Sequence, residues 1–150
     1  MFRGQVIRKL VKVCCLDAYM TSMPQKFVIF DLETTGLDPH EDRIIEMGAI
    51  KVDKQKLLET LDTMSWQCFV KQSEPLSGFI KNLTGITDEM LKDDETEAEA
   101  EALQGFFDFV GDYPLYAYNE KFDVGFVNNY YPRVYMGGWY GHRGYGRRWR

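Results

Sequence analysis

The chain has 150 residues, which suits one domain with a core of its own. Its 23 acidic and 18 basic side chains give a formal net charge of −5, so the overall charge gives no indication of electrostatic capture of nucleic acid. The three cysteines include two neighbours and have no ligand-like spacing, which argues against a disulfide framework or a zinc site. No apolar run approaches the roughly 20 residues of a membrane span. We therefore expect a cytoplasmic protein with no membrane partner.

Residues 1–24 are predicted to be an N-terminal extension that differs in character from the rest of the chain. Lys12 and Asp17 interrupt its apolar part, which argues against a signal peptide. Met23 would make a natural start for a compact domain. The extension itself has the pattern of either a short amphipathic helix or an irregular segment.

Three strands are expected to open the domain. The segment KFVIFDLE (26–33) is a short apolar run rich in β-forming residues, and the turn residues TTGLDP follow it. RIIEMGAIKVD (43–53) and TMSWQCFVKQ (63–72) have the composition of two further strands. Strands that follow one another along a chain usually pair antiparallel. The charged piece KQKLLETLD (54–62) is expected to be a loop or a short hairpin extension.

The second half of the domain is predicted to combine helices with a fourth strand. Its clearest helix is TEAEAEALQGFFDFVGD (96–112), which Thr96 would cap, with Glu99 completing a capping box. Short helical turns are expected in the glycine-containing segment before it. PLYAYN (114–119) has the composition of a strand, and KFDVGFVNNYY (121–131) that of the first turns of another helix.

The last part of the sequence, residues 132–150, has no helical or strand period and is expected to be an irregular tail. It holds five arginines, several aromatic residues and no acid. Arginines and stacking rings suit single-stranded nucleic acid, whereas a change of reading frame near Pro132 would give an equally unusual composition. The sequence leaves both interpretations of this tail open.

Two carboxylates, Asp31 and Glu33, end the most strand-like segment. Side chains alternate between the faces of a strand, so these two point the same way, and like charges repel unless a cation lies between them. Hard oxygen donors at the carboxyl end of a strand suit Mg²⁺ or Mn²⁺. Two such ions about 3.5–4 Å apart can hold the attacking and leaving oxygens of a phosphodiester displacement. Taken alone, the same pair also fits one turn cap and one solvated acid.

The sequence around this pair resembles the DEDD-type 3′–5′ exonucleases, the family of ribonuclease T and of the proofreading epsilon subunit of bacterial DNA polymerase III. The family's first motif is an apolar strand, D-x-E-T-T-G, a loop and an I-I-E-x-G-A strand, and residues 30–50 read FDLETTGLDPHEDRIIEMGAI. FIKNLTGITDEML (79–91) resembles the family's L-T-G-I-T segment. LYAYNEKFDVGFV (115–127) resembles its second motif, in which N-x-x-F-D follows a strand. The segments occur in the family's order.

This resemblance implies an α/β fold of the ribonuclease H-like type, with a mixed sheet and flanking helices over residues 25–131. It implies that Asp31, Glu33 and Asp123 hold two divalent ions, Mg²⁺ or Mn²⁺, and carry the catalysis. Glu46 would either line the cleft or face water. The residues that match the family's contacts to the terminal nucleotide, or its support of the catalytic loop, are Thr34, Thr35, Gly36, Leu37 and Asn119.

The family's third motif, H-x-A-x-x-D on a late helix, is not found in this sequence, which has only two histidines. His40 lies in the loop after the first motif. His142, the remaining candidate for a general base, begins HRGYGRR, a faint echo of the motif in which Arg147 stands where the aspartate would be. We therefore expect a C-terminally truncated domain, with a divergent exonuclease that borrows a base from a partner as the alternative.

Two functions follow from the resemblance. The first is a 3′–5′ exonuclease domain that acts on the 3′ end of single-stranded DNA, with RNA as the second substrate, in replication or repair. The second is a catalytically inactive domain of the same fold that binds nucleic acid or a DNA polymerase catalytic subunit. A decayed product without function is a further interpretation.

Overall fold

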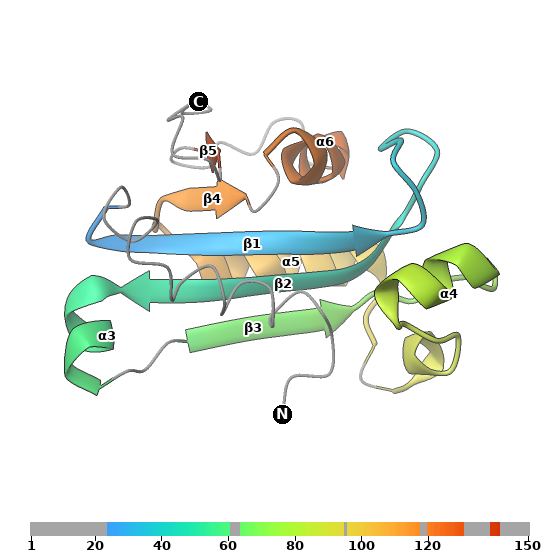
Figure 1. The fold of residues 1–150 in the computed structure, drawn as a ribbon, viewed down its shortest axis with the longest axis horizontal. Helices are drawn as coiled ribbons and strands as arrows, with labels where there is room; N and C mark the ends of the chain where they lie inside the picture. Colours follow the sequence, from blue (N-terminus) through green and yellow to red (C-terminus); the bar gives the residue numbers. More distant parts are fainter. Residues whose placement is uncertain (1–23, 61–63, 95, 118–119, 131–138, 142–150) are drawn as a thin grey trace.

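Five strands form one sheet, and the strand at its centre carries the first motif. The computed structural model describes residues 24–60, 64–94, 96–117, 120–130 and 139–141. The strands are β1 (Lys26–Thr34), β2 (Ile44–Asp53), β3 (Met64–Phe69), β4 (Leu115–Ala117) and β5 (Trp139–Gly141). Their order across the sheet is β3–β2–β1–β4–β5 (Figure 1).

The pairing of the strands makes the sheet mixed. β1 pairs antiparallel with β2, and β2 pairs antiparallel with β3, as the sequence predicted for its three leading strands. On the other side of β1, β4 runs parallel to it and β5 runs parallel to β4. β5 lies in the segment predicted to be irregular, and that expectation is wrong for residues 139–141. Its short sequence has no alternation to detect, and pairing with β4 makes it a strand.

The central strand β1 is buried on both faces. Phe27, Val28, Ile29 and Phe30 are all completely inaccessible to solvent, which explains why the sequence shows a continuous apolar run rather than alternation. Val28 and Phe30 belong to the main apolar cluster, which also takes residues from two helices. The strand is therefore fixed from both sides up to the point where its acidic residues begin.

The two helices of the main cluster are α5 (Glu99–Val110) and α6 (Glu120–Tyr130). In Figure 1, α5 lies behind the sheet and runs along its strands. The ring of Phe106 on α5 lies 5.1 Å from that of Phe30 and 6.0 Å from that of Trp66, centroid to centroid. The phenylalanines of α5 are packing residues: Phe106 is buried in the main apolar cluster, and Phe107 and Phe109 pack against it.

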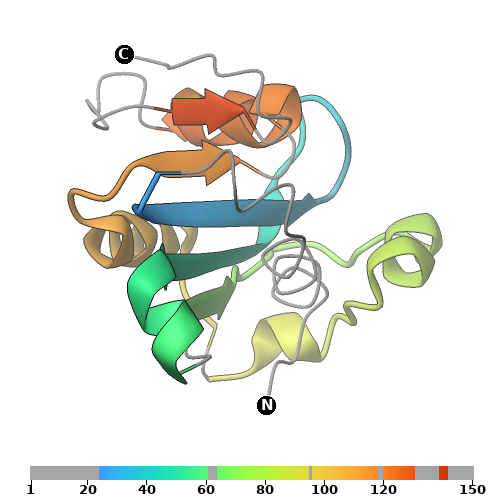
Figure 2. The ribbon, with the colours of Figure 1, turned by 60° about the vertical axis from the view of Figure 1, so that its left-hand side comes forward.

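The segment expected to be a loop after β2 is a helix, α3 (Lys54–Thr60). Oδ1 of Asp53 accepts a hydrogen bond from the backbone N–H of Gln55 at 3.1 Å, as an N-cap does. The residues that follow are good helix formers, so the capped segment is helical. In the sequence alone, its charged residues had indicated a loop. α3 lies at the end of the sheet opposite α4 (Gly78–Thr84), in Figure 1 and Figure 2 alike.

The helix α5 begins later than predicted, at Glu99, and Thr96 does not cap it. The hydroxyl of Thr96 donates instead to the backbone carbonyl of Asp93 at 2.7 Å. The side chain that caps the start of the helix belongs to Glu101, whose Oε2 accepts a hydrogen bond from the backbone N–H of Ala98 at 3.3 Å. The segment offers an acid at every other position from 97 to 101, so the sequence alone does not fix the first turn.

A second, smaller apolar cluster lies at the end of β2 and β3. It holds α4 and the single turn η1 (Met90–Lys92) against the sheet. Ser77 caps α4 by accepting the backbone N–H of Ile80 at 3.2 Å, and Gly85 ends it in the left-handed conformation, with φ 72°. The buried members of the cluster are Ile45, Leu76, Ile80, Ile86 and Leu91.

Cys68 is the cysteine in the described part of the chain, where it is buried and free of a disulfide. Burial raises the pKa of its thiol to about 12, so the group stays protonated at neutral pH. Cys14 and Cys15 lie outside the described residues, as does the predicted extension except Pro24. Within the described ranges, no helix is both long and apolar enough to cross a membrane.

Replacing Phe106 with alanine is expected to lower the free energy of unfolding by about 3–5 kcal/mol, because it leaves a cavity between α5 and the sheet. Urea unfolding followed by circular dichroism measures this loss. Phe79→Ala is the matched control, because its side chain is 73% exposed and its removal should change stability by no more than about 0.5 kcal/mol. Equal losses in the two variants would contradict this placement of the core.

Candidate active site

Asp31 and Glu33 lie at the carboxyl end of β1 and on the same face of the sheet. In the ladder with β2, Asp31 stands opposite Gly48 and Glu33 stands opposite Glu46. Asp31 is only 3% exposed, whereas Glu33 is half-buried. Leu32, between them, points the other way into the main apolar cluster. At this end of β1, side chains therefore alternate between the main apolar cluster on one face and the acids on the other.

Asp123 approaches the same end of the sheet from α6. The parallel register of β1 and β4 places Ala117, the last residue of β4, beside Phe30. α6 begins three residues later, at Glu120, and Figure 1 shows this helix on the side of the sheet where β1 ends. Asp123, in the first turn of α6, is completely buried. The parallel pairing thus directs the chain that carries the second-motif aspartate toward the end of the sheet that holds the first-motif pair.

The donors available here suit a hard divalent cation in type and in burial. Carboxylate oxygens are what Mg²⁺ and Mn²⁺ prefer, and buried carboxylates are costly unless a cation or hydrogen bonds compensate them. Among the described residues, however, no three histidine, cysteine or acidic side chains form a group arranged to hold a metal ion. The site has the chemistry of a metal centre without a preformed cluster of three ligands.

Glu46, for which the sequence left two environments open, does not face water. It is completely buried, and its Oε1 accepts a hydrogen bond from Nε2 of Gln67 on β3 at 3.0 Å. Glu46 and Glu33 are directly opposite each other in the ladder, where like charges disfavour the pairing. The face that carries Asp31 therefore gains a third carboxylate, held in place by a neutral amide.

The turn after β1 is ordered by its own side chains. The hydroxyl of Thr34 donates to the backbone carbonyl of Gly36 at 2.5 Å, and Thr34 itself is buried. Leu37, at the tip, is 84% exposed. Asn119 and His142, the other residues predicted to contribute, lie outside the described residues.

The comparison with known families agrees with this arrangement. The model of the RNase T family, described as exonuclease, matches residues 28–137. This chain belongs to the DEDD-type 3′–5′ exonuclease family. The resemblance that the motifs indicated is thereby confirmed.

Curated members of this exonuclease family with similar sequences are much longer proteins. DNA polymerase III of the PolC type from Halalkalibacterium halodurans is 37% identical over 127 residues, 85% of this chain and 8% of that protein. The PolC-type polymerase from Caldanaerobacter subterraneus is 41% identical over 108 residues, 72% of this chain and 7% of that protein. The chain thus spans less than a tenth of the length of these relatives.

Solved exonuclease structures share the fold. A structure of exonuclease I aligns with a TM-score of 0.59 and 21% identity over 75% of this chain and 25% of that one. Exonuclease I from Methylocaldum szegediense aligns with a TM-score of 0.56 and 24% identity over 69% of this chain and 22% of that one. These similarities confirm the ribonuclease H-like architecture predicted from the sequence.

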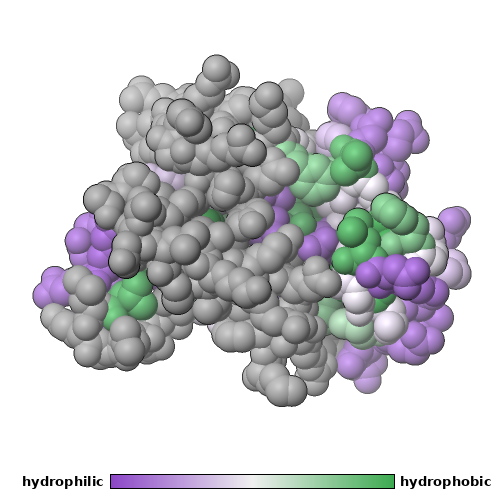
Figure 3. All heavy atoms as spheres, viewed as in Figure 1, coloured by the Kyte–Doolittle hydropathy of each residue, from purple (hydrophilic) through white to green (hydrophobic). Residues whose placement is uncertain are grey.

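Apolar side chains gather at the end of the exonuclease domain formed by α4 and the turn after β1. Figure 3 shows this grouping over α4 and beside it, with hydrophilic residues around it. Two large apolar residues of α4, Phe79 and Leu83, are more than half exposed, and so is Leu37 in the turn after β1. Exposed apolar groups that lie together are typical of a surface that binds a ligand.

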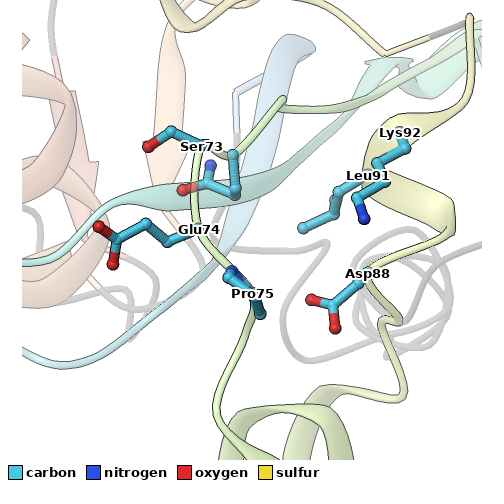
Figure 4. A pocket seen from close by; sticks show the side chains of 7 residues that line it. Ser73, Glu74, Pro75, Asp88, Leu91 and Lys92 are labelled. Atoms are coloured by element: carbon cyan, nitrogen blue, oxygen red, sulfur yellow. The ribbon is translucent and has the colours of Figure 1, made fainter.

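A pocket of about 210 Å³ lies nearby, between η1 and the loop after β3, as Figure 4 shows. None of the predicted catalytic carboxylates lines it; its charged residues are Glu74, Asp88 and Lys92. Asp88 has a structural role: one oxygen accepts the backbone N–H of Leu76 at 2.7 Å, and the other pairs with the ammonium of Lys81. The pocket therefore lies beside the link between η1 and α4 rather than at the carboxylates.

Stability should depend on pH through Asp88. The hydrogen bond from Lys81, followed by that from Leu76, lowers the pKa of its carboxyl below the ordinary value of an aspartate. A lowered folded-state pKa means that its stabilising effect is present above about pH 4 and is lost as the pH falls through the folded-state pKa. We expect Asp88→Asn to be less stable than wild type at pH 7 and the difference to shrink in acid, as measured by urea unfolding.

The control for this prediction is Glu74→Gln, which removes an exposed carboxylate from the same pocket. It should leave the unfolding midpoint unchanged at both pH values. A constant difference between Asp88→Asn and wild type from pH 7 to pH 3 would show that the carboxylate's charge does not contribute.

Proposed function

We propose that this chain is a metal-dependent 3′–5′ exonuclease domain that hydrolyses phosphodiester bonds of DNA, with RNA as the second substrate. The observation that carries the proposal is the burial of two acids: Asp31 near the end of β1, and Asp123 in the first turn of α6, the helix that follows the neighbouring strand β4. Buried acids at or just beyond the carboxyl ends of adjacent strands are typical of a ligand site rather than of a stabilising core. The PolC-type polymerases with similar sequences support DNA as the first substrate.

In the proposed mechanism, Asp31, Glu33 and Asp123 would hold the divalent ions, and Glu46 would add negative charge to the same face. When bound, the ions would supply the activated water and the charge neutralisation that phosphodiester hydrolysis requires. The turn from Thr34 to Leu37 receives the terminal nucleotide, and the exposed Leu37 side chain packs against its base. The burial of Asp31 and Asp123 excludes water from the protein side of the site.

The proton of the attacking water needs an acceptor, and the sequence offers no match to the family's histidine motif. His142 is the remaining candidate for this acceptor. Loss of a general base typically lowers the rate by about 10²–10⁴-fold. The proposed activity of the isolated chain is therefore slow, unless a partner contributes the base.

A second candidate function is a catalytically inactive domain that binds single-stranded nucleic acid or a DNA polymerase catalytic subunit. Two observations favour it: the missing third motif, and the lack of a three-ligand metal group in the described part of the chain. A structure of E. coli exonuclease I with single-stranded DNA has a TM-score of 0.59 to this chain, which supports nucleic acid as the partner of such a domain.

Incubation with Mn²⁺ and a 5′-labelled single strand is expected to produce a slow ladder of products shortened from the 3′ end. Gel electrophoresis over hours measures it. Asp31→Asn should abolish the ladder, because it removes a charged ligand while conserving shape; activity that survives in this variant belongs to a contaminant. Binding of the strand without any ladder would favour the second candidate.

Metal binding can be tested without catalysis. A ligand that binds only the folded state at 100 times its Kd stabilises it by about 2.7 kcal/mol, so Mn²⁺ should raise the unfolding midpoint of the wild-type chain. Asp31→Asn should lose most of this shift, whereas Glu89→Gln, at an exposed position on η1, should retain it. Equal shifts in all three proteins would mean that Mn²⁺ acts elsewhere.

A further inference from the structure

We propose that Asp42 is a positioning residue, which fixes the turn from Thr35 to Asp38 so that Leu37 is held ready for the terminal base. This inference rests on the proposed function, because it takes that turn as the nucleotide-binding element. The sequence did not single out Asp42, which lies near the end of the loop between β1 and β2.

The loop is closed by hydrogen bonds between its two ends. The backbone N–H of Thr35 donates to the carbonyl of Arg43 at 2.9 Å. In return, the backbone N–H of Arg43 donates to the hydroxyl oxygen of Thr35 at 2.9 Å. Asp42 directly precedes Arg43, so these hydrogen bonds bring Asp42 close to the start of the turn.

The carboxylate of Asp42 uses both of its oxygens to hold this turn. Oδ1 accepts from the hydroxyl of Thr35 at 3.1 Å, and Oδ2 accepts from the backbone N–H of Asp38 at 3.0 Å. The backbone N–H of Asp42 also donates to the carbonyl of Asp38 at 2.7 Å. Hydrogen bonds to a charged acceptor are stronger than neutral ones, and here they hold the residues on both sides of Gly36 and Leu37.

Gly36 shows how closely the carboxylate approaches the turn. A Cβ atom added to Gly36 would overlap the carboxylate carbon and both oxygens of Asp42. Only glycine permits this approach without displacing one of the two groups. The turn and the acid are therefore built as one unit, and neither can change without affecting the other.

The result is an exposed apolar side chain on a tethered stretch of backbone. Leu37 is 84% exposed, although its two neighbours are held by the hydrogen bonds described above. A fixed binding element loses less conformational freedom when its ligand arrives. Because the flat apolar face of a nucleobase would cover Leu37, the rigidity of the turn contributes to affinity.

Charge alone predicts the opposite effect of removing Asp42. Nucleic acid is a polyanion, so loss of an acid near its binding surface should strengthen binding. A positioning role predicts weaker binding, because the turn loses its tether while the electrostatics improve. The sign of the change therefore separates the two roles.

The test measures the Kd for a 5′-fluorescein-labelled oligothymidine by fluorescence anisotropy, in EDTA and at constant salt. Asp42→Ala should weaken binding roughly fivefold to tenfold, about the effect of losing one to two net hydrogen bonds. Asp42→Asn keeps the shape and one acceptor oxygen, so it should fall between Asp42→Ala and wild type. Glu41→Gln removes the same charge from the exposed neighbouring residue and should bind as wild type or slightly more tightly.

A double-mutant cycle tests the contact with Gly36 directly. Gly36→Ala should weaken binding in the wild-type background, because its methyl group displaces the Asp42 carboxylate. The same substitution should cost clearly less in the Asp42→Ala background, where the carboxylate is gone. Additive effects would overturn the proposed coupling, and circular dichroism verifies that each variant is folded. If Asp42→Ala does not fold, the cycle is run with Asp42→Ser, which also removes the atoms that a Cβ on Gly36 would overlap.

Failure of the inference can be distinguished from failure of the proposed function. If Leu37→Ala weakens binding and Asp42→Ala does not, the positioning role is wrong and the nucleotide-binding role of the turn stands. If wild type and Leu37→Ala bind the strand equally, the turn does not bind nucleotides. That result overturns both the nucleotide-binding role of the turn and the positioning role of Asp42. Weaker binding by Asp42→Ala, without the same effect in Glu41→Gln, supports the inference.

Discussion

The burial of Asp31 at the end of the central strand is the constraint on which the fold and the site both depend. The residues before it fill the core on both faces of β1, so the backbone that carries the carboxylate has no freedom to move. A charge placed there is costly unless something compensates it. The fold therefore fixes an acid where stability alone would favour an apolar residue.

The neighbouring elements add further acids to the same part of the fold. β2 places Glu46 opposite Glu33, and α6 places a buried Asp123 beyond the end of β4. The bond from Gln67 to Glu46 is neutral, so it orients the carboxylate without cancelling its charge. Acids gathered on one buried face are typical of a site that takes a cation, which compensates the cost of burying them.

The sequence predicted the three leading strands because their signals are local, and it singled out the carboxylates of β1 for the same reason. A continuous apolar run, a turn and a second apolar run define β1 and β2, and an acid at the end of such a run is noticeable. The predicted start of α5 was wrong because several acids in the segment could each complete the cap. The helix α3 was missed because its cap is a hydrogen bond from a backbone N–H to the Asp53 side chain, which the sequence does not reveal. β5 became a strand through its partner. Asp42 was overlooked because its importance comes from a contact with Gly36 that only the folded loop creates.

The lengths of the strand pairings have a consequence for the way in which the site opens. β1 and β2 pair over nearly their whole lengths, whereas β4 joins β1 through three residues. Segments held by few backbone pairs open more readily than the rest of a fold. On backbone pairing alone, the carboxylates of β1 should belong to the most persistent part of the domain, and the segment that carries Asp123 should separate at lower free energy. Ligands that bridge the two would slow amide exchange in α6 far more than in β1.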